Sequence, residues 1–157
     1  MDEIKREILP SNLASLLRHN LPIHYDDEQS LISILRRVPS SISTVYAESN
    51  GEKRKFERHT TGKNPGGFVE STSNVDSSSF VSEHALVMKN STVINSKILN
   101  LAVVTGNSFV KNSTIEEFAL VAGDSKIQNS IISGNAVIKG KATVISKKEG
   151  GWEVISY

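Results

Sequence analysis

The stretch that decides the fold runs from Val81 to Val144 and reads VSEHALVMKNSTVINSKILNLAVVTGNSFVKNSTIEEFALVAGDSKIQNSIISGNAVIKGKATV. Repeated steps of six, six and five residues along this stretch land only on valine or isoleucine. These positions are Val81, Val87, Val93, Ile98, Val104, Val110, Ile115, Val121, Ile127, Ile132, Ile138 and Val144. The residue two places before each is always serine or alanine: Ser79, Ala85, Ser91, Ser96, Ala102, Ser108, Ser113, Ala119, Ser125, Ser130, Ala136 and Ala142.

Strand geometry explains this pattern, because residues i and i−2 of a strand share one face. A β-branched residue fills the inside of each short strand, and the small residue before it lies at a narrow corner. Three short sides then close one coil of 17 residues, and successive coils stack at about 4.8 Å, the spacing of hydrogen-bonded strands. Each buried valine or isoleucine stabilises by about 1.5–3 kcal/mol. The pattern therefore predicts a mainly β protein with a three-sided parallel β-helix over residues 67–145.

Two further columns repeat every 17 residues at the predicted corners. Asparagines follow one side of each coil, at Asn95, Asn112 and Asn129. Asparagine tolerates left-handed backbone angles and forms side-chain ladders between stacked strands. Glycines stand at a different corner, at Gly106, Gly123 and Gly140, which predicts a turn with positive φ.

The flanking segments predict three further units. Residues 1–43 read as a helical N-terminal region, with one helix over 2–19 interrupted near Pro10 and a second that begins at Asp26–Glu28. Residues 44–66 contain a hairpin around Asn50-Gly51 and a loop. Residues 146–157 are expected to form a C-terminal capping strand or hairpin, with Trp152 over the last coil, since solenoid ends need covering.

Composition excludes several classes of function. The chain of 157 residues carries a net charge of +1, which gives no electrostatic reason to expect nucleic-acid or membrane partners. It contains no cysteine, so disulfides and thiolate chemistry are excluded. The first residues are charged and lack an apolar run. We therefore expect synthesis and residence in the cytoplasm.

The repeat resembles the hexapeptide repeat of left-handed β-helix proteins, and this resemblance is the basis for expecting the left hand. The segment Gly66-Gly67-Phe68-Val69-Glu70, followed by Asn74-Val75 and by Val81 to Val87, looks more narrowly like uncharacterised hexapeptide proteins of phages and prophages. The resemblance covers about residues 44–144. It implies assembly into homotrimers and, for a phage-encoded protein, residence in the host cytoplasm or in a virion.

Many hexapeptide proteins are acyltransferases that, by resemblance, use a histidine in a cleft between subunits. Only His84 lies within the repeat, and no insertion interrupts the register to form a projecting loop. The other histidines, His19, His24 and His59, lack the spacing of metal ligands. The sequence thus favours a protein without catalytic residue, cofactor or metal, with an acyltransferase using His84 as the alternative. A binder of a small molecule or sugar near Trp152 is a third possibility.

One outer side of the predicted solenoid is apolar over four coils, and such patches usually mark contacts. The residues expected to form an oligomer or partner interface are Leu86, Met88, Leu101, Val103, Phe118, Leu120 and Val137. Either a second copy or the chain's own N-terminal helices could cover this side, and we favour self-association. The hypothesis is a non-enzymatic, self-assembling structural or protein-binding module, with an unidentified protein partner in a virion or the host.

Overall fold

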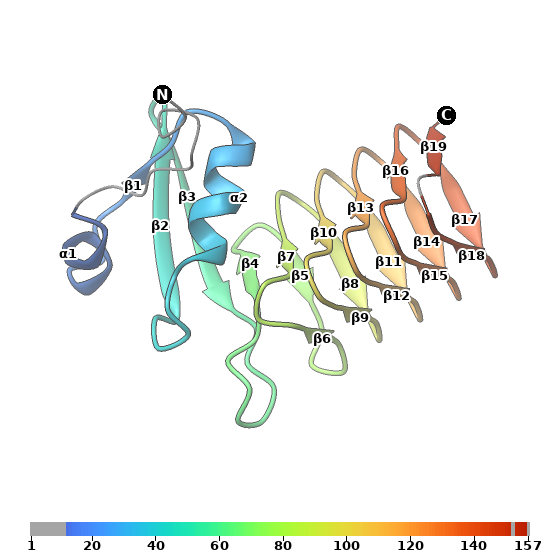
Figure 1. Ribbon diagram of the computed structural model, residues 1–157, viewed down its shortest axis with the longest axis horizontal. Coiled ribbons are helices and arrows are strands. Elements are labelled where there is room, and N and C mark those ends of the chain that lie inside the picture. Colours follow the sequence, from blue (N-terminus) through green and yellow to red (C-terminus); the bar gives the residue numbers. More distant parts are fainter. Residues whose placement is uncertain (1–11, 152, 157) are drawn as a thin grey trace.

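The computed structural model describes residues 12–151 and 153–156, and from Phe68 onward the chain forms a parallel β-solenoid of about five turns (Figure 1). Each turn has three sides, and each side contributes one strand to one of three sheets. The first side consists of β4 (Phe68–Glu70), β7 (Leu86–Val87), β10 (Val103–Val104), β13 (Leu120–Val121), β16 (Val137–Lys139) and β19 (Val154–Ser156). The predicted three-sided parallel architecture, with about 17 residues per turn, is confirmed.

The other two sides form five-stranded sheets. The second side consists of β5 (Asn74–Val75), β8 (Thr92–Ile94), β11 (Phe109–Lys111), β14 (Lys126–Gln128) and β17 (Thr143–Ile145). The third side consists of β6 (Phe80–Val81), β9 (Lys97–Ile98), β12 (Thr114–Ile115), β15 (Ile131–Ile132) and β18 (Lys148–Glu149). The coil that begins at β4 places Val69 opposite Val87, 18 residues away, whereas later coils pair residues 17 apart.

The core inside the solenoid is formed by the residues that the repeat predicted. None of the inward valines and isoleucines between Val81 and Val144 is more than 1% exposed. The serines and alanines two places before them are buried at the corners. The glycine corner has φ of 79°, 73° and 70° at Gly106, Gly123 and Gly140. A Cβ atom on Gly106 would come within 2.5 Å of the Gly123 carbonyl, so both the conformation and the close stacking require glycine.

From Asn95 onward, the corner between the second and third sides has a left-handed residue in each coil, and the step there is five residues. We call it the asparagine corner; it comprises Asn95, Asn112, Asn129 and Ser146, with φ between 46° and 56°. The amide that follows each turn is bonded to a side chain of the preceding coil instead of to a carbonyl. The Ser113 amide donates to Ser96 Oγ at 3.0 Å, and the Ser130 amide donates to Ser113 Oγ at 3.0 Å.

The same contact recurs along the corner and forms a serine ladder of Ser79, Ser96, Ser113 and Ser130. In the last three, the hydroxyl also donates to the carbonyl two residues earlier, at 2.7–2.8 Å. Serine at this corner is therefore required for its hydrogen bonds as well as its size. Buried amides without a partner would cost about 1–3 kcal/mol each.

The N-terminal region continues the sheet of the first side and covers the start of the solenoid (Figure 1). The predicted hairpin is confirmed as β2 (Thr44–Ser49) and β3 (Glu52–Arg58), with Asn50 and Gly51 both at positive φ. β3 pairs antiparallel with β4, and β1 (Ile23–His24) pairs parallel with β2.

The two helices are α1 (Leu13–Arg18) and α2 (Glu28–Arg36). The second predicted helix is confirmed as α2, whereas the part of the first prediction before Asn12 lies outside the described residues. Among the described residues, no helix has the length and apolar composition that crossing a bilayer requires.

Of the two forms expected for residues 146–157, a strand or a hairpin, the hairpin is not formed, because the strands β18 and β19 pair parallel with β15 and β16 as one more coil. Glu149 takes the register position of Ile132, and Ile155 that of Ile138. The corner positions two residues before Glu149 and Ile155 are occupied by Lys147 and Glu153 instead of serine or alanine. The repeat in the sequence therefore stops one coil before the repeat in the structure. Trp152, expected over the last coil, lies outside the described residues.

We expect Ser113→Ala to lower the free energy of unfolding by about 1–3 kcal/mol, because the buried Ser130 amide loses its acceptor. Ser108→Ala is the matched control: the Ser108 hydroxyl donates to the Thr105 carbonyl at 2.8 Å, and Ala142 already occupies the same column in a later coil. Ser108→Ala should lower the free energy of unfolding by less than about 1 kcal/mol. Urea unfolding would measure both variants, and equal losses would contradict the ladder's role.

We expect Glu149→Ile to raise the free energy of unfolding by about 1 kcal/mol at neutral pH, since it restores part of an inward apolar side chain. Burial, and then the charge and hydrogen bond of Glu153, raise the pKa of Glu149 above its ordinary value of 4.5. A carboxyl with a raised pKa in the folded state destabilises above that pKa, and the penalty disappears as the pH falls below 4.5.

The gain from Glu149→Ile should therefore be largest near neutral pH and smaller in acid. Glu149→Gln, which removes only the charge, is the control and should show only the pH-dependent part. A gain for Glu149→Ile that is the same at both pH values would show that the charge is not the cause. Thermal melting of the three proteins at neutral and acid pH measures this.

Candidate interaction surface

The outer column of the first side is an unbroken line of apolar residues whose exposure rises along the solenoid. Phe68, Leu86, Val103, Leu120, Val137 and Val154 pair in register from coil to coil. Leu86 is 1% exposed, Val103 is 7% exposed and Val154 is 60% exposed. Leu120 and Val137 are half-buried between them. We call this column the apolar stripe. Its residues are buried at the start of the solenoid and exposed at its end.

Helix α2 is the element that covers the start of this stripe. Its residues Leu31, Ile32, Ile34 and Leu35 are buried, and they belong to one apolar cluster with Leu86, Met88 and Val103. Asp27 caps the helix by accepting a hydrogen bond from the Ser30 amide at 2.8 Å. At the other end, Arg36 donates to the Leu101 carbonyl at 2.6 Å and to the His84 carbonyl at 3.3 Å.

These contacts correct the preferred assignment for part of the predicted interface. Leu86 and Met88 are no more than 1% exposed and Val103 is 7% exposed, so they are buried in an apolar cluster of their own chain that includes residues of α2, and little of their surface is left for a second copy. The sequence pattern could not distinguish the two covers, because the apolar face of α2 is chemically like the apolar face that a second copy would present. The cover by the N-terminal helices, which the sequence left as an alternative, accounts for these three residues.

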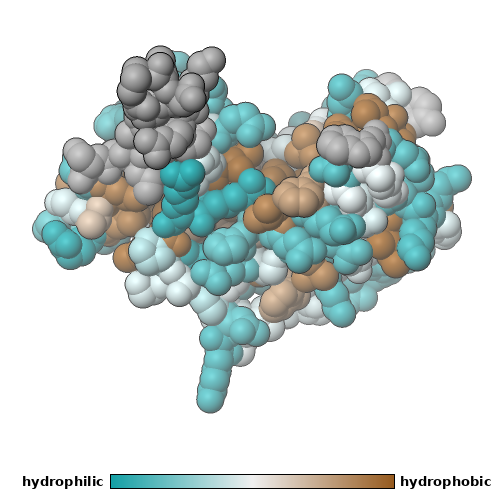
Figure 2. Space-filling view, viewed as in Figure 1, coloured by the Kyte–Doolittle hydropathy of each residue, from teal (hydrophilic) through white to brown (hydrophobic). Residues whose placement is uncertain are grey.

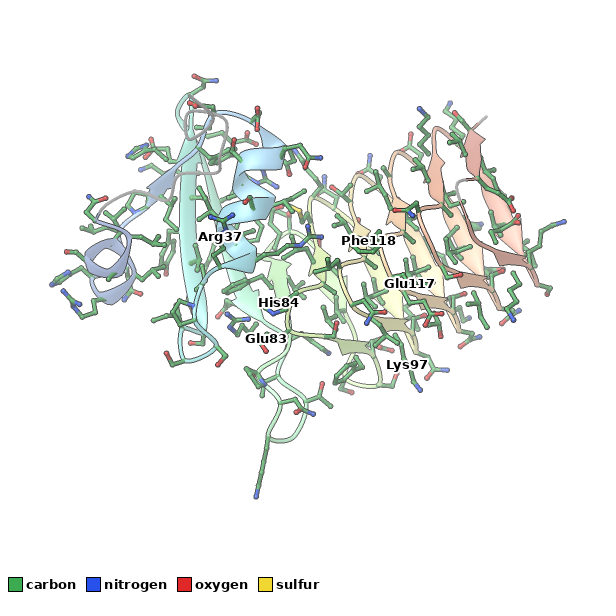
Figure 3. The ribbon with its side chains drawn as sticks, in the orientation of Figure 1. Arg37, Glu83, His84, Lys97, Glu117 and Phe118 are labelled. Atoms are coloured by element: carbon green, nitrogen blue, oxygen red, sulfur yellow. The ribbon has the colours of Figure 1, made fainter. Side chains whose placement is uncertain are left out.

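The remaining predicted residues line a groove between α2 and the later coils. Leu101, Phe118, Leu120 and Val137 form its solenoid wall, and Ile32 belongs to its helix wall. Phe118 stands at the corner between the third and first sides and is 62% exposed. Figure 2 shows hydrophobic side chains gathered between the N-terminal region and the solenoid, and Figure 3 shows Phe118 on the solenoid near α2. We call this surface the apolar groove.

Two large apolar residues of the apolar groove, Val154 and Ile32, are absent from the predicted interface. Val154 lies 17 residues after Val137 in the same column, so the repeat would have found it if extended by one coil. Ile32 comes from a helix whose place in the fold no periodicity records.

His84 lies at the corner of an early coil and is exposed (Figure 3). Its backbone carbonyl accepts the bond from Arg36, while no described side chain forms a hydrogen bond with its ring. A general base is normally oriented by such a bond, so the described surroundings offer His84 no catalytic partner. His19 and His59 instead bond to the carbonyls of Ser15 and Ser79, both at 2.9 Å. No group of three or more potential metal ligands occurs among residues 12–151 and 153–156.

A buried ionic network fixes the start of α2 to the solenoid. Arg54 of β3 donates two hydrogen bonds to Glu70 of β4, at 2.8 and 2.7 Å, and two to Glu28 of α2, at 2.9 and 3.1 Å. Burial alone would lower the pKa of Arg54, but its hydrogen bonds with Glu70, Glu28 and Tyr25 outweigh burial and hold the pKa above its ordinary value. The Glu70 carboxylate also accepts the Lys89 amide at 2.7 Å.

We expect Arg54→Met to lower the free energy of unfolding by about 3–5 kcal/mol, because it leaves the buried Glu70 carboxylate without its cation. Adding Glu70→Gln to this variant should recover part of the loss, since the uncompensated charge is then removed. Urea unfolding of the single and double variants measures both effects. A double variant that is less stable than Arg54→Met would contradict the charge argument.

Comparisons with models of known protein families, with curated proteins and with solved structures find no match for this chain. The fold and the surfaces described above are therefore the basis for any statement about its activity.

Proposed function

We propose that this protein is a non-enzymatic assembly module that associates with further copies of itself through the apolar groove. The observation that carries the proposal is the apolar column of the first side, which rises from 1% exposure at Leu86 to 60% at Val154. A contiguous apolar surface of this kind usually marks a contact with another protein.

A second copy fits the groove because the chain supplies both a projection and a hollow. Phe118 is an exposed aromatic side chain at the edge of the solenoid wall of the groove, and Ile32 lines the helix wall opposite. A contact in which each subunit inserts its projection into the hollow of the next is heterologous, and it closes into a ring when the rotation permits. The homotrimer that the hexapeptide resemblance implies is one such ring.

The internal packing of the chain supports this choice of partner. Apolar residues of α2 already share one buried cluster with residues of the first side, in which Leu86 and Met88 are no more than 1% exposed. A neighbouring copy would extend the same layer over Leu120, Val137 and Val154. The contact would thus continue an interface that the fold has already formed within one chain.

The biological setting belongs to the same proposal. The resemblance to phage and prophage hexapeptide proteins supports a role for the assembled solenoid in a virion or in the host cytoplasm, where its outer surface would bind a further protein. A left-handed coil is part of that resemblance.

We expect the wild-type protein to have the mass of an oligomer, measured by size-exclusion chromatography with light scattering, and Phe118→Glu to have that of a monomer. A charge at this position must be desolvated in the contact, which costs several kcal/mol per ion. Phe109→Glu is the matched control, because Phe109 points outward on the second side and is half-buried. It should leave the mass unchanged.

A monomeric wild-type protein over the accessible concentration range would contradict self-association. Dissociation by both glutamate variants would also count against the proposal, because it would show a general loss of structure. Circular dichroism of each variant separates that loss from a specific effect on the interface.

A further inference from the structure

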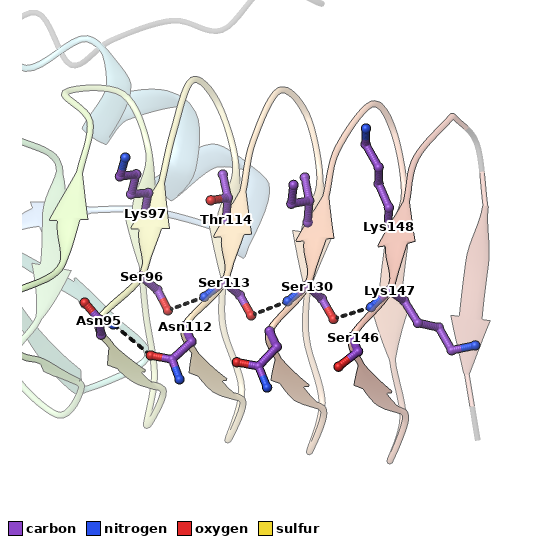
Figure 4. A pocket seen from close by; sticks show the side chains of 12 residues that line it. Asn95, Ser96, Lys97, Asn112, Ser113, Thr114, Ser130, Ser146, Lys147 and Lys148 are labelled. Atoms are coloured by element: carbon purple, nitrogen blue, oxygen red, sulfur yellow. Dashed lines mark hydrogen bonds between the residues drawn. The ribbon is translucent and has the colours of Figure 1, made fainter.

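The asparagine corner carries a second groove, which extends over four coils and shares no lining residue with the apolar groove (Figure 4). The serine ladder lies buried beneath it. Exposed residues of the corner flank it on one side, with Asn95 and Asn112 among them, and Lys97 and Lys148 of the third side flank it on the other. Because the coils are in register, each of these side chains belongs to a column that follows the solenoid axis. The groove therefore runs straight along the solenoid, and its lining is polar except for Ile131, which is 38% exposed. We call it the polar track.

The charged side chains along this track are all cationic. Lys97, Lys147 and Lys148 line it, and no described carboxylate does. Lys97 and Lys148 form no ion pair with any described residue, whereas Lys147 interacts electrostatically with Glu149. Lys97 and Lys148 are three coils apart, which corresponds to about 14 Å at the strand spacing of about 4.8 Å. An anionic ligand that pairs with both lysines must carry negative charges about this far apart, which suits an extended chain.

The asparagine side chains between the two lysines have donor and acceptor atoms that form no hydrogen bond with described residues. Asn95 Nδ2 donates to Asn112 Oδ1 at 2.8 Å, which leaves the Asn112 amino group without a described partner. The Asn129 side chain makes no hydrogen bond with any described residue. Each asparagine amide can both donate and accept. The track therefore suits a ligand that carries neutral hydroxyl groups between its charges.

Two other classes of linear polymer fit the track less well. Single-stranded nucleic acids are held by aromatic side chains on which the bases stack, and none of the described aromatic residues lines this groove. An extended peptide binds by adding a strand to free backbone groups. Here the coils already satisfy their amides, as in the bonds from Asn112 to the Ile94 carbonyl and from Thr114 to the Ser130 carbonyl.

We infer that the asparagine corner binds a linear acidic oligosaccharide, with Lys97 and Lys148 pairing its anionic groups and Asn112 and Asn129 bonding its hydroxyls. This site is independent of the self-association surface. It also differs from the sugar site near Trp152 that the sequence left possible, because it extends along several coils of the solenoid.

Isothermal titration calorimetry of the full chain with oligogalacturonate and with sulfated heparin oligosaccharides tests the inference. A neutral cello-oligosaccharide, single-stranded poly-deoxythymidine and poly-glutamate serve as comparison ligands. We expect saturable binding to at least one acidic saccharide, weakening with added salt, and weaker binding to each comparison ligand. Absence of binding to both acidic saccharides overturns the inference. Equal or tighter binding of poly-deoxythymidine or poly-glutamate overturns it as well, in favour of a nucleic acid or an acidic peptide.

Variants then locate the site. The double variant Lys97→Glu, Lys148→Glu should lower the affinity by at least about tenfold, because two exposed ion pairs are replaced by repulsion. The double variant Lys111→Glu, Lys126→Glu on the second side carries the same change in net charge and should alter the affinity by less than about twofold. Equal losses in the two double variants would show attraction by net charge alone and would overturn the site.

Asn129→Gly tests the hydroxyl contacts with little risk to the fold, because glycine accepts the positive φ of 50° at this position. We expect it to weaken saccharide binding by about threefold to tenfold, which corresponds to one hydrogen bond. It should leave the melting temperature nearly unchanged. If Asn129→Gly binds the saccharide as tightly as the wild type, Asn129 does not contact the ligand. If the double variant Lys97→Glu, Lys148→Glu also keeps the wild-type affinity, the inference is overturned.

Discussion

The serine ladder is the interaction on which the rest of the structure depends. At a corner that turns in five residues, one amide per coil donates to a serine hydroxyl of the coil before instead of to a carbonyl. Serine is the residue that both fits this corner and supplies the hydroxyl. The five-residue step in turn keeps successive coils 17 residues apart, so that equivalent residues stack. Without that register there would be no columns, and neither the apolar groove nor the polar track would exist.

The stacked columns explain how single residue choices become extended surfaces. One outward position of the first side is apolar in every coil from Phe68 to Val154, so it forms a stripe as long as the solenoid. Helix α2 is too short to cover that stripe: it ends at Arg36, whose guanidinium donates to the carbonyls of His84 and Leu101. The position of the apolar groove therefore follows from a mismatch between the length of one helix and the length of the stack.

The sequence predicted the solenoid because its core is periodic, and it failed where the structure departs from the period. Inward valine and isoleucine, small corner residues and the asparagine and glycine corners were all readable as residues 17 apart. The last coil was missed because Glu149 replaces an inward aliphatic residue and Lys147 replaces a small one, although backbone pairing continues through both. The packing of α2 was left open, since its apolar stripe would suit a neighbouring chain equally well. The hydrogen-bonding role of Ser113 was also hidden, because alanine at other corners suggested that size alone mattered.

The two grooves of this protein differ in the physical interaction that would fill them, although both arise from the same repeat. On the first side the outward residues are apolar, and the favourable contact is one that removes them from water. At the asparagine corner most outward residues are side-chain amides, hydroxyls and ammonium groups, which are hydrated in the free protein and favour a charged or hydroxylated ligand. Because the linings share no residue, a copy bound along the apolar groove leaves the lining of the polar track unused. An assembly of several copies would then carry several parallel tracks, and a long acidic polymer that contacts more than one of them would be held by avidity rather than by any single strong contact.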